Sequence, residues 1–120
     1  MKARLFKLNY EELLTSTSLS EVTILLIMDN FLRFEFLIQH RLKEDISEES
    51  KAGFEEGLES ISFAENYLLK LSQGNIKIAD THEDYEYIIN ILHRGLRDLF
   101  KDENINESYF EDWLKSRNCE

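Results

Sequence analysis

Apolar side chains recur at spacings of three and four residues along residues 24–42, and this pattern predicts one long amphipathic helix. The stripe consists of Ile24, Ile27, Met28, Phe31, Phe34, Ile38 and Leu42. The chain contains no proline, the residue that interrupts helix interiors most strongly. We therefore expect residues 20–45 to form a helix. The letters FLRFEFLI also alternate in polarity, and the preceding DN could form a turn. A β-hairpin over residues 21–40 within an α+β fold is the alternative.

Helix start and stop signals divide the rest of the chain. Asn9, Ser18 and Thr81 each stand three residues before an acid, which is typical of helix N-termini. Asn9 predicts a helix over about residues 10–16, which could extend back to Ala3. Ser18 predicts a helix that begins at about residue 20. Thr81 predicts a helix that ends at about residue 101.

Two further helices complete the predicted fold. One begins after Ser47 and ends near Gly74, a typical C-terminal cap, and the other covers about residues 107–116. The letters NIKIAD, residues 75–80, predict a short extended connector between the helix that ends near Gly74 and the helix that begins at Thr81. We expect residues 1–120 to form a single domain of the all-α class, a small bundle of four to five helices around one core.

The net charge of −10 is concentrated in two blocks of the sequence. Residues 44–66 hold eight acids and one base, whereas residues 80–120 hold eleven acids and five bases. An acidic chain repels phosphates, so direct binding of nucleic acid is not expected. Long-range attraction favours a basic protein partner instead.

The first acidic block lies on the helix predicted over residues 48–70. Helical spacing places its acids away from the apolar stripe, with two aromatic side chains on or beside the same side. The predicted partner-binding residues here are Glu48, Glu55, Glu56, Glu59, Phe63 and Tyr67. Aromatic side chains among acids supply the apolar anchoring typical of interface hot spots. The alternative is that Phe63 and Tyr67 pack beneath another helix.

The second acidic block begins with the letters THEDYEYIINIL, residues 81–92. Acids in the first turn of a helix interact favourably with its dipole, so the simplest interpretation is a solvated helix start. We expect it to add Glu83, Asp84, Glu86 and Tyr87 to the partner-binding surface. A metal site could use His82 with Glu86, but no further histidine or cysteine pair supports it. We therefore predict no metal and no cofactor.

Arg33 and His40 lie seven residues apart in the letters RFEFLIQH, on one face of the long predicted helix. This spacing resembles the arginine–histidine end of the motif in HEPN ribonucleases, which are all-helical dimers. The resemblance covers eight residues and implies metal-free RNA cleavage by Arg33 and His40. Phe34 follows Arg33, where those enzymes usually carry a polar residue. The alternative, which we favour, is that both side chains pair with nearby acids.

Other features bear on compartment and chemistry. The one cysteine is Cys119, and the N-terminal residues lack the layout of a secretory signal. The most apolar segment, residues 22–38, contains charged side chains, so it is unsuited to span a bilayer. No glycine-rich phosphate loop or GxSxG elbow occurs. We expect a cytoplasmic protein that is not an enzyme and does not enter membranes.

The function predicted from these features is an acidic inhibitor or immunity-type protein that occludes a basic partner such as a nuclease toxin. A first alternative is a phage- or plasmid-borne nucleic-acid mimic that blocks a defence nuclease. A second is the HEPN-like ribonuclease. A third is a dimeric structural subunit that uses Val22, Leu26 and Leu37 as its interface. Both a monomer and a homodimer are compatible with the sequence.

Overall fold

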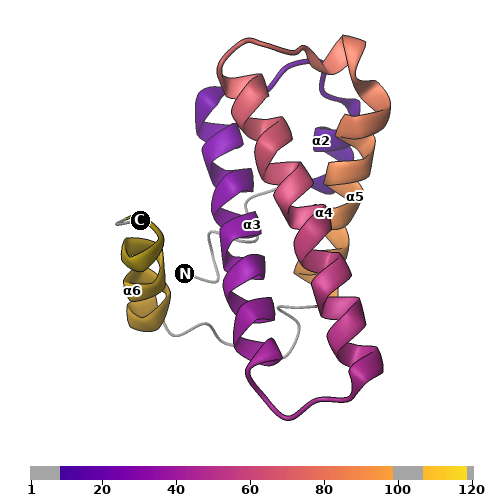
Figure 1. Ribbon diagram of the computed structural model, residues 1–120. Coiled ribbons are helices and arrows are strands. Elements are labelled where there is room, and N and C mark those ends of the chain that lie inside the picture. Colours follow the sequence, from indigo (N-terminus) through magenta and orange to yellow (C-terminus); the bar gives the residue numbers. More distant parts are fainter. Residues whose placement is uncertain (1–8, 99–106, 119–120) are drawn as a thin grey trace.

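A computed structural model describes residues 9–98 and 107–118, which form an all-α bundle (Figure 1). Its helices are α2 (Tyr10–Thr15), α3 (Glu21–Leu42), α4 (Glu48–Ser72), α5 (His82–Asp98) and α6 (Glu107–Asn118), with a 3₁₀ turn, η1 (Ile78–Asp80), before α5. No strand occurs within these two ranges. The predicted all-α bundle is confirmed. The hairpin alternative for residues 21–40 is wrong, because that whole segment belongs to α3.

Side-chain caps define where the helices begin. Asn9, Ser20 and Ser47 each accept a hydrogen bond from the backbone N–H three residues further on, at 3.0–3.1 Å. Such bonds satisfy a helix N–H that has no partner within the helix. The sequence predicted the caps at Asn9 and Ser47. For α3 the sequence predicted Ser18 as the capping residue, whereas the structure has Ser20 in that role.

The C-terminal end of α4 forms a Schellman motif. Gly74 adopts φ +75°, a left-handed conformation that favours glycine. The N–H of Asn75 donates to the carbonyl of Lys70 at 3.0 Å, and the N–H of Gly74 donates to that of Leu71 at 3.2 Å. Gly74 therefore ends α4 as the sequence predicted. The extended connector predicted for residues 75–80 is wrong in part, because Ile78–Asp80 form the 3₁₀ turn η1, from which the side chain of Ile78 enters the core.

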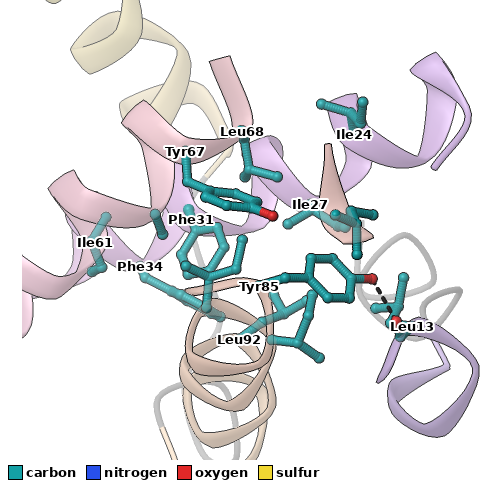
Figure 2. Close-up of a cluster of buried hydrophobic side chains, with 14 of the residues drawn as sticks. Leu13, Ile24, Ile27, Phe31, Phe34, Ile61, Tyr67, Leu68, Tyr85 and Leu92 are labelled. Atoms are coloured by element: carbon teal, nitrogen blue, oxygen red, sulfur yellow. Dashed lines mark hydrogen bonds between the residues drawn. The ribbon is translucent and has the colours of Figure 1, made fainter. Parts of the chain in front are cut away.

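Three long helices, α3, α4 and α5, run antiparallel in succession and enclose the core (Figure 1). Figure 2 shows the buried side chains that they contribute, among them Phe31, Phe34, Ile61, Leu68 and Leu92. Tyr85 of α5 is fully buried, and its hydroxyl donates to the carbonyl of Leu13 (Figure 2). This bond attaches the short helix α2 to the bundle.

The last helix, α6, packs on the side of α3 that faces away from α4 and α5 (Figure 1). Phe110 of α6 is 2% exposed, and its ring lies 5.5 Å from that of Phe36. The guanidinium carbon of Arg33 lies 4.4 Å from the centre of the Phe110 ring. The indole N–H of Trp113 donates to the amide oxygen of Gln39 at 3.0 Å. Both faces of α3 are thus used for packing over part of its length.

The predicted helix limits agree with the structure to within a few residues. The extension of the first helix back to Ala3 and the end of α5 at residues 99–101 lie outside the described residues. Of the three side chains expected on a dimer face, Leu37 is 6% exposed within the fold, Leu26 is half-buried, and Val22 is 68% exposed. The predicted dimer face therefore loses Leu37. Over the described ranges, no helix has the length and apolar character needed to cross a membrane.

Candidate protein-binding groove

The acidic face of α4 points away from the core. Glu48, Glu55, Glu56 and Glu59 are all exposed, as their helical spacing predicted, whereas Ile61 is buried. Carboxylates one helical turn apart have Cβ atoms about 5–6 Å from each other. The four side chains can therefore contact one surface of another molecule.

Phe63 of α4 and Tyr87 of α5 form an exposed aromatic pair beside these acids. Their ring centres are 5.6 Å apart at an interplanar angle of 61°, an edge-to-face contact. The hydroxyl of Tyr87 lies within hydrogen-bonding distance, 3.0 Å, of the hydroxyl of Ser60. Both rings keep a large part of their surface in solvent, 39% for Phe63 and 44% for Tyr87. Two aromatic side chains fixed against each other but open to solvent are available for contact with a partner.

The aromatic pair lines a hollow between α4 and α5. This hollow has a volume of about 400 Å³. Its lining consists of Glu56, Glu59, Ser60, Phe63, Asp84 and Tyr87. Five of these six side chains were predicted as partner-binding residues from the sequence. They come from two separate acidic blocks, which the antiparallel packing of α4 and α5 brings together.

A second hollow of about 460 Å³ continues the first along the same two helices. Glu56, Ser60 and Tyr87 line both hollows. The other residues of the second hollow are Phe34, Ile38, Gly57, Ile61, Ile91, Arg94 and Gly95. We refer to the two hollows together as the α4–α5 groove. None of these seven additional residues of the second hollow was predicted as a functional residue. The sequence signal that could have identified them is the presence of Gly57 in α4 and Gly95 in α5, two glycines within neighbouring helices.

Tyr67 is not part of this surface, and the prediction that its ring lies among the exposed acids is wrong. Its side chain is 5% exposed, and its hydroxyl lies 2.7 Å from that of Thr81. Burial raises the pKa of the Tyr67 hydroxyl, partly offset by the Thr81 hydrogen bond. Thr81, just before α5, and Tyr85 of α5 contact Tyr67, whereas Phe63 lies one turn earlier on α4. The alternative interpretation, packing beneath another helix, therefore holds for Tyr67 and fails for Phe63.

The remaining predicted residues of α5, Glu83 and Glu86, are exposed but do not line the groove. Glu86 lies 3.7 Å from the imidazole of His82, one turn away on the same helix. Across the ranges that the structure describes, no three side chains of His, Cys, Asp or Glu are grouped as a metal ion would require. The first turn of α5 thus has the character of a solvated helix start.

Arg33 and His40 have different surroundings. The Nε of Arg33 donates to a carboxylate oxygen of Asp29 at 2.9 Å, and the side chain is 4% exposed beneath α6. His40 is exposed and lies 3.8 Å from a carboxylate oxygen of Glu44. The expectation that both side chains pair with nearby acids is confirmed. The chain matches no protein-family model, and no curated protein or solved structure is significantly similar to it.

Proposed function

We propose that this chain is a non-enzymatic, acidic binding protein of the inhibitor or immunity type. It would dock on a basic surface of a partner, such as the substrate-binding face of a nuclease toxin, and occlude it. The observation that carries this proposal is the α4–α5 groove, in which Glu56, Glu59 and Asp84 surround the exposed rings of Phe63 and Tyr87.

The groove combines the two contributions that tight association needs. The carboxylates complement the lysines and arginines with which a nuclease holds phosphates, and the net charge of −10 attracts such a partner from a distance. Electrostatic attraction of this kind raises association rates toward about 10⁸ M⁻¹s⁻¹ at low salt. The aromatic pair adds apolar contact area, which keeps the complex together once it has formed.

A concave site with an aromatic lining favours a protein partner over the alternative roles. A nucleic-acid mimic would present acids spread over an elongated surface rather than gathered beside an aromatic pair. A structural dimer would use Val22, Leu26 and Leu37 of α3, none of which lines the groove. Neither of these alternative functions makes use of the exposed aromatic rings of Phe63 and Tyr87.

The test uses the protein products of the neighbouring genes, each purified and mixed with this chain. A basic product should bind, and if it is a nuclease, its activity should fall in proportion to the complex formed. Replacing Glu56→Lys together with Glu59→Lys should weaken binding by about a hundredfold or more, because truncating or reversing buried interface charges costs several kcal/mol.

Glu111→Lys with Asp112→Lys is the matched control, because both side chains are exposed on α6 and lie outside the groove. Both double variants change the net charge equally. Equal loss of binding in the two would reduce the effect to overall charge and contradict a defined groove. Full binding by the Glu56→Lys, Glu59→Lys variant would remove the basis of the proposal.

A further inference from the structure

The two ends of the α4–α5 groove differ in chemistry. At one end, Phe63 and Tyr87 stand among Glu59 and Asp84, and every charged side chain that lines this end is an acid. At the other end the lining adds the apolar side chains of Phe34, Ile38, Ile61 and Ile91, with Arg94 as its base. Glu56 lies at the junction, because it lines both hollows. An occupant of the whole groove therefore meets negative charge, an apolar recess and a positive charge in that order.

Two glycines, Gly57 and Gly95, are among the residues that line the apolar end. Phe34, Ile38 and Ile61 form its floor and are 1–4% exposed. A Cβ added at Gly57 would meet Ile38 Cδ1 at 3.5 Å, an ordinary contact, with no other atom among its near neighbours. Because Ile38 supplies the one near neighbour of this position and Gly57 lines the hollow, we expect a larger side chain there to occupy part of the groove.

The arrangement of the two hollows favours a chain segment as occupant, because they adjoin each other along neighbouring helices. Each hollow, at about 400 and 460 Å³, lies within the range of about 300–1,000 Å³ that is typical of ligand-binding pockets. The two hollows follow adjacent antiparallel helices, and a third helix laid between them is a common mode of peptide recognition. Lysine and arginine side chains of such a segment complement the acidic end.

We infer that the α4–α5 groove binds a basic amphipathic segment of the partner, with one bulky apolar side chain seated beside Gly57. This inference rests on the proposed function and specifies how that site recognises its partner. The lysines or arginines of the segment contact Glu56, Glu59 and Asp84. Its apolar side chain covers Phe34, Ile38 and Ile61. The positive charge of Arg94 excludes further bases from the apolar end, which fixes the direction of the segment.

The test uses three synthetic peptides as probes. The first is a lysine-rich amphipathic helix with one phenylalanine on its apolar face, the second has alanine in place of that phenylalanine, and the third has glutamate in place of every lysine. Calorimetry should give an affinity for the first peptide about tenfold or more above that for the second, because burying a phenylalanine contributes at least that factor. The third peptide should not bind.

Gly57→Leu fills the recess without changing charge. It should reduce the affinity for the phenylalanine peptide to that for the alanine peptide. Gly53→Leu is the matched control, because a Cβ at Gly53, one turn earlier on α4, meets no atom within 4 Å and Gly53 does not line the groove; its affinities should equal those of the unmodified protein. Thermal melts report whether each variant folds. If Gly57→Leu does not fold, Gly57→Ala can replace it, because alanine adds less volume to the recess. Gly57→Ala should also lower the ratio of the affinity for the phenylalanine peptide to that for the alanine peptide.

The outcomes separate this inference from the proposed function. Equal affinity for the first two peptides, with both weakened by Glu56→Gln and Glu59→Gln, would overturn the apolar recess and leave the acidic docking surface standing. An unchanged phenylalanine preference in folded Gly57→Leu would overturn it as well. Binding of the glutamate peptide, or binding of no peptide at all, would contradict both.

Discussion

The backbone of Gly95 in α5 lies directly against the ring of Phe34 in α3. A Cβ at residue 95 would come within 2.5 Å of two carbons of that ring and 2.9 Å of a third. Phe34 is 1% exposed and forms part of the floor of the α4–α5 groove. The missing side chain at Gly95 thus lets α3 and α5 approach closely, and the ring of Phe34 fills the space between them.

Gly95→Ala should therefore destabilise the protein, although alanine favours helices. The overpacked contact costs about 1–3 kcal/mol, which exceeds the helix gain of about 0.5–1 kcal/mol. Chemical denaturation measures the difference. Gly53→Ala is the control, because its new methyl meets no atom within 4 Å, and it should raise the free energy of unfolding. Stabilisation by both substitutions would contradict the close approach of α5 to Phe34.

Tyr85 should make the stability fall at alkaline pH. Burial raises the pKa of its hydroxyl to about 12, with a smaller contribution from Tyr67. Since the folded-state pKa lies above the unfolded value of 10.0, the stabilisation is complete below pH 10. It is lost as the pH rises toward about 12. Denaturation midpoints measured across this range should decline less steeply in Tyr85→Phe.

At neutral pH the same variant isolates the hydrogen bond to α2. Without the Tyr85 hydroxyl, the carbonyl of Leu13 loses the donor shown in Figure 2, at a cost of about 1–2 kcal/mol. The unmodified protein, measured under the same conditions, is the reference. Stability of Tyr85→Phe equal to that of the unmodified protein would show that the bond contributes nothing measurable.

The helices could be predicted from the sequence because their signals are local. Apolar spacing defined the whole of α3, and Gly74 marked the end of α4. The N-terminal cap of α3 was assigned two residues early, to Ser18, because Ser18 and Ser20 are both competent caps and Ser18 stands three residues before Glu21. The turn at η1 was missed because the burial of Ile78 depends on helices distant in the sequence.

Part of the candidate site could also be predicted, because the exposure of side chains on a helix follows from local spacing. Exposure of the acids of α4 follows from helical spacing alone. Phe63 and Tyr67 lie close together on one side of α4, so spacing could not separate them. Their fates differ because Thr81 and Tyr85 cover Tyr67, while Phe63 meets the exposed ring of Tyr87. The groove itself was missed because its lining comes from three helices.

Arg33 should attach α6 to the bundle. Its side chain bridges Asp29 and the ring of Phe110, so Arg33→Ala should cost about 1–3 kcal/mol through the lost pair and stacking. Trp113 is the one tryptophan, and its fluorescence emission should shift to the red as α6 separates from α3. Arg33→Lys keeps the charge but not the planar stack and should be intermediate.

The control for α6 attachment is Lys43→Ala, an exposed position just after α3. It should leave both the emission of Trp113 and the stability unchanged. An unshifted emission in Arg33→Ala, with the loss of stability intact, would mean that the remaining contacts of α6 hold it in place without Arg33.

The protein should not cleave RNA. Metal-free cleavage by an arginine and a histidine needs both side chains to reach the same phosphate, yet Arg33 is covered by α6 and paired with Asp29, while His40 is exposed. Incubation with labelled single-stranded RNA should give no products above the buffer control. His82→Ala is the matched control for His40→Ala, because His82 is also exposed and lies one turn from a glutamate. RNA degradation that disappears in His40→Ala but persists in His82→Ala would make the chain an enzyme and replace the binding role proposed for it.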